Sequence, residues 1–373
     1  MLAMMTFRAT LLSFALLLAP ATAQDTLADL QKQFAGEAQT LAGRSPTREQ
    51  RDELLARHTD VLQKFVAERA KGDDRWNGRL MLADLLLQAG NRDRAGETIA
   101  AIDGAAAPGL VLLTAASMAQ HLGKKDLRTR CLEAALGKPS PLADRLAMAR
   151  LLMTVLHEIP RGEQVFTEAL AKAEDDEQRA LIRFHRADTM RDREDLPDNA
   201  GFEEFDKLAK DLPKTYWGGI ARDRLSATDL RPGSKAIPFT AKVRGGGEFT
   251  LAQQMGKVVV LAFWSAADHD TPTLVALLRE MARRHGDRLA VLGICLDRDP
   301  AGIARAVQDL GIDFTVVGEG LGIETDVALR WFVEGPVVHV VDAQGKIAGL
   351  GLHAGTADAR NELQTTVAGA IKP

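Results

Sequence analysis

Cysteine, dense positive charge and long apolar stretches are all scarce in this chain of 373 residues. Its two cysteines, Cys131 and Cys295, stand far apart, which excludes the closely spaced disulfide framework of small secreted domains. The formal net charge is −4 and no segment is dense in Lys or Arg, so nothing predicts binding to nucleic acid. After residue 23, no apolar stretch approaches the ~20 residues that a membrane-spanning helix needs. We therefore expect a mature chain without a transmembrane segment.

The first 23 residues have the pattern of a signal peptide. Arg8 is the one charged residue among them, and residues 9–18 are largely apolar. Ala21-Thr22-Ala23 then supplies small residues for cleavage before Gln24. We expect cleavage after Ala23 and a periplasmic or secreted location.

Residues 24–227 are predicted to form an all-α domain of helical hairpins. Segment 85–93 matches segment 118–126 at an offset of 33 residues, which resembles tetratricopeptide repeats although most of their consensus positions are missing. The spacing predicts about four hairpins. One helix is expected to begin with Ser45 as N-cap and Pro46 as its first residue. Such a domain either binds a protein or peptide partner on one face or only packs on its neighbour, and both interpretations stay open.

Residues 228–235 are predicted to be a linker, because Pro and Gly together end the helical pattern. In residues 236–373 strands alternate with helices, which indicates an α/β domain. The expected elements are a hairpin at 237–243 and 248–251, strands at 258–263, 289–297 and 314–317, helices at 271–285, 301–310 and 323–332, a second hairpin at 337–341 and 346–352, and a helix at 357–370. Asp270 or Thr271 is the expected N-cap of the helix at 271–285.

Three motifs in this second domain resemble one family. Residues 256–264 form a Gly-Lys turn and an apolar strand that ends in Phe-Trp, and residues 291–297 form a second apolar strand that ends in Asp. Glu334-Gly335-Pro336 precedes a strand and an Asp-x-x-Gly turn. Together they resemble the thioredoxin fold in its TlpA/AhpC-TSA-like branch, the exported thiol–disulfide oxidoreductases of bacteria. The resemblance implies a thioredoxin-like domain with a cis bond before Pro336.

The Cys-x-x-Cys motif of that family does not carry over. Asp268 and Thr271 stand where the resemblance places the two cysteines, and neither side chain can attack a disulfide as a thiolate does. Cys295 lies in the middle of an apolar strand and Cys131 in the other domain, so both are expected to be buried thiols. We therefore predict no catalytic residues and regard Asp268 and Thr271 as vacated redox positions. The alternative is a TlpA-like, thiol–disulfide oxidoreductase-related enzyme that borrows a thiol from a partner.

His269 and Asp270 admit two interpretations. With a further ligand such as His339 or His353 they could form a metal site, which needs three or four converging groups. Alternatively, the acidic side chains of the turn only stabilise the helix N-terminus, by about 0.3–1 kcal/mol each. We expect the second case, with no metal and no cofactor, and keep a metal-dependent activity at Asp268, His269 and Asp270 as an alternative.

The surroundings of the vacated positions define a candidate peptide groove. In the resembling family, the backbone beside the proline pairs with an extended peptide, and this pairing needs no cysteine. The groove could also be a remnant of the fold. We predict an exported, non-catalytic protein-interaction module whose partner is a protein or peptide. The candidate groove residues are Trp264, His269, Asp270, Gly335, Pro336 and Val337.

Overall fold

The computed structural model describes residues 26–197 and 199–371, so the predicted signal peptide lies outside the described residues. The chain divides into two compact units that meet in the sequence between residues 201 and 202. No described helix combines the length and the apolar composition that a membrane crossing requires.

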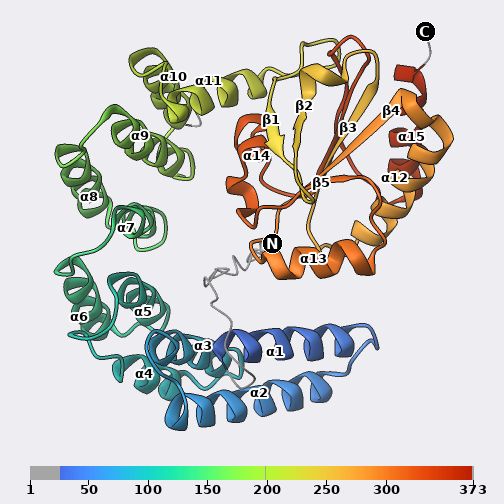
Figure 1. Ribbon diagram of the computed structural model, residues 1–373. Coiled ribbons are helices and arrows are strands. Elements are labelled where there is room, and N and C mark those ends of the chain that lie inside the picture. The colour runs from blue at the N-terminus through green and yellow to red at the C-terminus, as the bar shows by residue number, and fades with distance from the viewer. Residues whose placement is uncertain (1–25, 198, 372–373) are drawn as a thin grey trace, which may run out of the picture. The chain divides into compact units, whose positions relative to one another are not determined.

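The first unit consists of helices joined as antiparallel hairpins (Figure 1). The first helices of successive hairpins begin at Asp74, Gly109, Leu142 and Asp176, so each start follows the last by 33 to 35 residues. This region fits helical repeats, as the sequence offset predicts. Its helices are α1 (Leu27–Ala42), α2 (Arg48–Glu68), α3 (Asp74–Gln88), α4 (Arg92–Ala100), α5 (Gly109–His121), α6 (Lys125–Leu136), α7 (Leu142–Thr154), α8 (Ile159–Ala171) and α9 (Asp176–Arg191).

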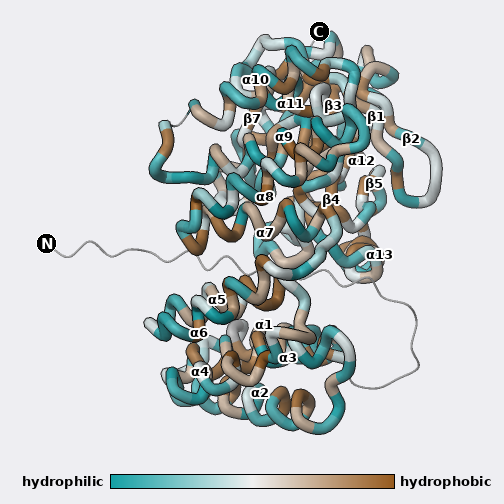
Figure 2. The backbone as a smooth tube through the Cα atoms, turned by 90° about the vertical axis from the view of Figure 1, so that its left-hand side faces the viewer, coloured by the Kyte–Doolittle hydropathy of each residue, from teal (hydrophilic) through white to brown (hydrophobic). Residues whose placement is uncertain are grey.

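Apolar residues alternate with polar ones along these helices, as the colours of Figure 2 show. The apolar sides of α1 to α7 form one core that runs from Leu27 to Leu156, and those of α7 to α9 form a second that runs from Leu146 to Ile182. Close approach between paired helices depends on small residues. A Cβ atom at Gly162 of α8, for example, would lie 2.2 Å from Met153 Cγ and 2.9 Å from the Ala149 carbonyl oxygen of α7.

The start of α2 differs from the prediction. Thr47, and not Ser45, is the N-cap: its hydroxyl accepts a hydrogen bond from the Gln50 N–H, while the Gln50 side chain accepts from the Thr47 N–H. This reciprocal pair is a capping box, which satisfies two donors of the helix terminus, whereas Ser45 has a positive φ of 52° and not the extended backbone of an N-cap. Pro46 consequently precedes the helix.

The second unit contains the thioredoxin-like fold. It begins within α10 (Ala200–Asp211) and continues through α11 (Tyr216–Thr228) into a β-hairpin and a five-stranded mixed sheet with strand order β5-β4-β3-β6-β7. β3 pairs in parallel with β4, β4 in parallel with β5, and β6 is antiparallel to both β3 and β7. The strands are β1 (Thr240–Lys242), β2 (Glu248–Thr250), β3 (Val258–Trp264), β4 (Leu289–Cys295), β5 (Thr315–Val317), β6 (Val337–Val341) and β7 (Ile347–Leu352).

All seven residues of β3 are buried, because helices or the β1–β2 hairpin cover both faces of the sheet. Alternate residues of β3 enter different cores: Trp264 belongs to the one with α12 (Thr271–His285) and α15 (Ala357–Ile371), and Phe263 to the one with α14 (Asp326–Trp331). Figure 1 shows α12 and α15 on one side of the sheet and α14 on the other. The remaining helix, α13 (Pro300–Asp309), adds Ile303 to the first core.

The predicted strands, hairpins and helices of this unit are present, with one change. The helix expected over 323–332 is split into a 3₁₀ turn, η3 (Gly322–Glu324), and α14. Thr325 separates them with an extended backbone, and its hydroxyl donates to the Gly322 carbonyl at 2.7 Å. Two further 3₁₀ segments are η1 (Leu251–Gln254) and η2 (Gly286–Arg288).

The peptide bond before Pro336 is not cis, since the described residues contain no cis bond. The expectation drawn from the resemblance is wrong here. Trans is the intrinsically favoured form of an X–Pro bond, by about 0.5–1 kcal/mol, so a cis bond has to be held by surrounding contacts.

Helix α11 packs directly on α14 of the same unit. Arg330 of α14 forms an ion pair with Asp223 of α11 at 2.5 Å, and Arg224 Nε donates to the Leu329 carbonyl at 3.2 Å. The compact unit thus includes α11, which precedes the predicted linker at 228–235. That linker stays a prediction.

Candidate functional site

The turn that follows β3 is anchored by one carboxylate. Asp297, just beyond β4, accepts hydrogen bonds from the Ser265 hydroxyl, from the Ala266 N–H at 2.8 Å and from the Cys295 thiol at 3.3 Å. β3 and β4 are parallel, and Trp264 lies opposite Cys295 in the register. Their carboxyl ends therefore meet at one edge of the sheet, where α/β folds commonly carry a site.

Asp268 and Thr271 occupy the two ends of a tight turn at this edge. The Thr271 N–H donates to the Asp268 carbonyl at 3.2 Å. Thr271 is only 1% exposed, and its hydroxyl donates to the Ser265 carbonyl at 2.7 Å. Its side chain therefore closes the turn internally. Asp268 is half-buried, and its carboxylate accepts from the Asp270 N–H at 3.3 Å.

His269 points into solvent, with 94% of its side chain exposed, and its Nδ1 lies 2.7 Å from an Asp270 carboxylate oxygen. Asp270 is the N-cap residue of α12, as predicted, but its carboxylate accepts no cap hydrogen bond. Among the described residues, no group of three or more His, Cys, Asp or Glu side chains is arranged to hold a metal ion. The His269–Asp270 pair thus has no third ligand there.

Cys295 is buried beside this turn. Removal of the thiol from water raises its pKa to about 12, and the Asp297 carboxylate that accepts its hydrogen bond also disfavours the thiolate. A thiol with this pKa is almost entirely protonated at neutral pH and is a poor nucleophile. Cys131 is buried in the helical unit, where burial also raises its pKa.

The candidate groove residues divide into two groups. Gly335, Pro336 and Val337 lie together at the start of β6, where Val337 pairs with Phe263 of β3, and all three line a cavity of about 380 Å³. Trp264 is 1% exposed and packs in the core on the α12 face, so it does not line this cavity. His269 and Asp270 do not line it either.

His339 is a cavity residue that sequence reasoning considered only as a metal ligand. It lies on β6, is 8% exposed, and stacks on Trp331 with ring centroids 5.7 Å apart. Its Nδ1 accepts a hydrogen bond from the Gly351 N–H at 3.2 Å. Burial lowers the pKa of His339 to about 4, so the ring is neutral at pH 7. One sequence signal was available: a lone polar residue within the apolar run 337–341.

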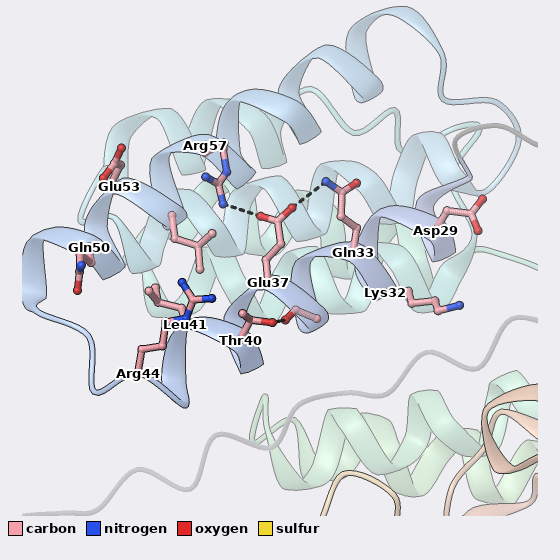
Figure 3. Close-up of a pocket in the computed structure, with 12 residues that line it drawn as sticks. Asp29, Lys32, Gln33, Glu37, Thr40, Leu41, Arg44, Gln50, Glu53 and Arg57 are labelled. Atoms are coloured by element: carbon pink, nitrogen blue, oxygen red, sulfur yellow. Dashed lines mark hydrogen bonds and ion pairs between the residues drawn. The ribbon is translucent and has the colours of Figure 1, made fainter. Parts of the chain in front are cut away.

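A larger cavity, of about 830 Å³, lies between α1 and α2. In Figure 3, Glu37 projects between Gln33 and Arg57. Hydrogen bonds from Gln33, His58 and Arg57 lower the pKa of Glu37 to about 2. The carboxylate is therefore already satisfied within the hairpin, and the lining mixes both signs of charge: Asp29, Lys32, Glu37, Arg44, Glu53 and Arg57.

Comparison with known proteins gives a family match for the second unit. Residues 232–349 match the AhpC/TSA family. No curated protein matches the chain.

Among solved structures, a candidate thiol:disulfide interchange protein DsbE from Chlorobium tepidum is 22% identical, with 38% of this chain and 99% of that chain covered and a TM-score of 0.35. The thioredoxin domain of a thiol-disulfide oxidoreductase from Bacteroides vulgatus is 22% identical over 37% and 99% of the two chains, with a TM-score of 0.32. A thioredoxin family thiol:disulfide interchange protein from Chlorobium tepidum is 20% identical over 39% and 99%, with a TM-score of 0.31. The activities in these names are those of the named proteins.

Proposed function

We propose that this protein is an exported, non-catalytic interaction module in which a thioredoxin fold without redox cysteines binds a protein or peptide partner. The observation that carries the proposal is the turn at residues 268–271. Asp268 and Thr271 hold the ends of the turn, and the Thr271 hydroxyl is already bonded to the Ser265 carbonyl. Disulfide exchange needs an accessible thiolate, and neither end of this turn supplies one.

Peptide binding is supported by the segment before β6. Pro336 is exposed, and the Gly335 N–H has no hydrogen-bond partner among the described residues. An extended peptide can satisfy such a donor with its own carbonyl groups. Export is supported by the signal-peptide pattern of residues 1–23. The helical repeats offer a second surface for a protein partner.

If the oxidoreductase alternative used a thiol of this chain near the turn, that thiol would be Cys295. Its pKa of about 12 and its burial both oppose attack on a disulfide. The metal-dependent alternative would need a third ligand for His269 and Asp270, and the described residues offer none in reach.

A turnover assay tests the proposal. Reduction of insulin by dithiothreitol is followed with and without the purified full chain. We expect no acceleration above the uncatalysed rate. An acceleration that disappears in Cys295→Ala would overturn the proposal and establish the oxidoreductase alternative. The Cys131→Ala variant, which removes the distant thiol, is the matched control.

A further inference from the structure

The cavity beside Gly335 and Pro336 is walled partly by a helix outside the sheet. Ala227, at the end of α11, and Leu230, just after it, line the cavity together with the segment 331–337 and the hairpin residues His339 and Leu350. The ion pair of Asp223 with Arg330 holds α11 against α14. The cavity is therefore a built feature of the unit.

Most of the lining side chains are apolar, and polar atoms of the backbone, Glu334 and His339 make up much of the remaining surface. Glu334 and His339 are its titratable residues, and no Lys or Arg lines it. The volume of about 380 Å³ lies within the range of small-ligand pockets and exceeds that of a single large side chain. A neutral histidine and one carboxylate give the cavity no attraction for an anionic group.

His339 supplies a directed donor in this apolar wall. Because Nδ1 accepts the Gly351 N–H, the neutral ring carries its proton on Nε2. The ring also interacts with the Val338 backbone, and the side chain as a whole is more than nine-tenths buried, but Nε2 itself is not among the fully buried atoms that lack a partner. The indole N–H of Trp331, another lining residue, is buried and has no partner in the part of the chain that the structure describes. A buried donor such as the Trp331 indole N–H is normally satisfied, so a ligand with acceptor groups in this cavity would supply the missing partner.

We infer that this cavity is a specificity pocket that takes one bulky, uncharged apolar side chain of a bound peptide, with His339 Nε2–H donating to a carbonyl oxygen of that peptide. A peptide suits the site better than a small free molecule, because the unpartnered Gly335 N–H at the rim offers a second donor to a chain of repeating carbonyls. The inference rests on the proposed peptide-binding function. Beyond that function, the inference specifies the type of side chain by which the partner is recognised.

Fluorescence anisotropy with the full chain tests this inference. The probes are labelled, C-amidated peptides of sequence Gly-Ser-X-Ser-Gly, in which X is Phe, Leu, Ala or Glu. Burial of the side chain predicts that the Phe and Leu peptides bind at least about 10-fold more tightly than the Ala peptide. The Glu peptide should bind no more tightly than the Ala peptide.

Two variants probe the pocket wall. His339→Phe keeps the aromatic stacking and removes the donor, and should weaken binding of the Phe peptide about 5- to 10-fold, whereas His339→Gln retains an N–H donor and should bind within about 3-fold of the parent. Leu230→Arg places a charge in the pocket and should abolish the preference for Phe over Ala. Leu321→Arg, at an exposed residue outside the lining, is the control and should change nothing.

The outcomes separate the pocket from the proposed function. If all four peptides bind equally and Leu230→Arg has no effect, the pocket is overturned while peptide binding stands. If no peptide binds, the proposed peptide groove fails and the pocket with it. Should circular dichroism show that His339→Phe is unfolded, the Leu230→Arg result decides.

Discussion

At the scale of single residues, the chemistry of the sheet edge depends on what side chains do with their hydrogen bonds. Asp297 uses its carboxylate to fix the turn after β3, and Thr271 uses its hydroxyl to close that turn. The neighbouring Cys295 thiol is itself a donor to Asp297. Each of these three groups therefore supports the local structure, and the thiol among them is not left as an accessible nucleophile.

The buried His339 predicts how the stability of the folded chain depends on pH. Its pKa is about 4 in the folded chain against 6.5 for an ordinary histidine, so the unfolded chain binds the extra proton between pH 6.5 and 4. Stability must therefore fall as pH drops through that window, by about 3 kcal/mol for this group. We expect His339→Phe to lose this part of the pH dependence.

Urea unfolding of both proteins at pH 7.5, 6, 5 and 4 measures the effect. As pH falls, the free energy of unfolding should decrease less for His339→Phe than for the parent protein. If the free energies of unfolding of the two proteins change in parallel from pH 7.5 to 4, His339 does not have a depressed pKa.

At the scale of elements, the turn 268–271 has a backbone geometry that is compatible with a disulfide. The hydrogen bond from the Thr271 N–H to the Asp268 carbonyl makes it a β-turn, in which the end Cα atoms lie within 7 Å. That separation covers the Cα distances of most disulfides, and the start of α12 lowers the pKa of a thiol placed there. We therefore expect the double variant Asp268→Cys/Thr271→Cys to form an internal disulfide and to accelerate insulin reduction by dithiothreitol.

A double variant with a different separation between the two cysteines is the control for this gain of function. His269→Cys/Thr271→Cys places two thiols in the same turn without the i, i+3 relation and should show little turnover. Equal turnover by both double variants, or by neither, would mean that the turn does not retain a redox-competent geometry.

Helix packing in the repeats gives a second prediction at this scale. Alanine favours helices over glycine by about 1 kcal/mol, but at Gly162 its Cβ would collide with Met153 and with the Ala149 carbonyl. Overpacking of this kind typically costs about 1–3 kcal/mol, so Gly162→Ala should lower the thermal stability. Gly36→Ala, at a position of α1 with open space, should raise it. Thermal unfolding that moves in the same direction for both variants would contradict this account.

Among the elements, β3 and the start of α2 differ in how far their sequence predicts them. β3 was predictable because seven consecutive apolar residues can be buried on both faces only inside a sheet covered on both sides. The sequence predicts the cap of α2 at Ser45, because Ser45-Pro46 is a strong local start signal, whereas the helix begins at the reciprocal bonds of Thr47 and Gln50. Both Ser45 and Thr47 are suitable N-cap residues by type, and the hydrogen bonds of the folded chain determine which of them is used.

At the scale of the whole molecule, the two fold types follow from a change in hydrophobic period along the chain. The pocket could not be predicted in the same way. It combines Leu230 with His339 and Gly335, and the contact of Asp223 with Arg330 that holds α11 in place spans more than a hundred residues of sequence. Nothing in the local pattern of α11 indicates that it would pack on α14 of the thioredoxin-like unit.

The central claim is that this thioredoxin fold holds a peptide at the start of β6 without reacting with it. The most direct measurement titrates the ¹⁵N-labelled full chain with an apolar peptide that contains a disulfide, and follows backbone signals and intact mass in the same sample. We predict shifts at Gly335, Val337 and His339 with no change in protein mass. A mixed-disulfide adduct, or binding that leaves these three signals unmoved, would contradict the account.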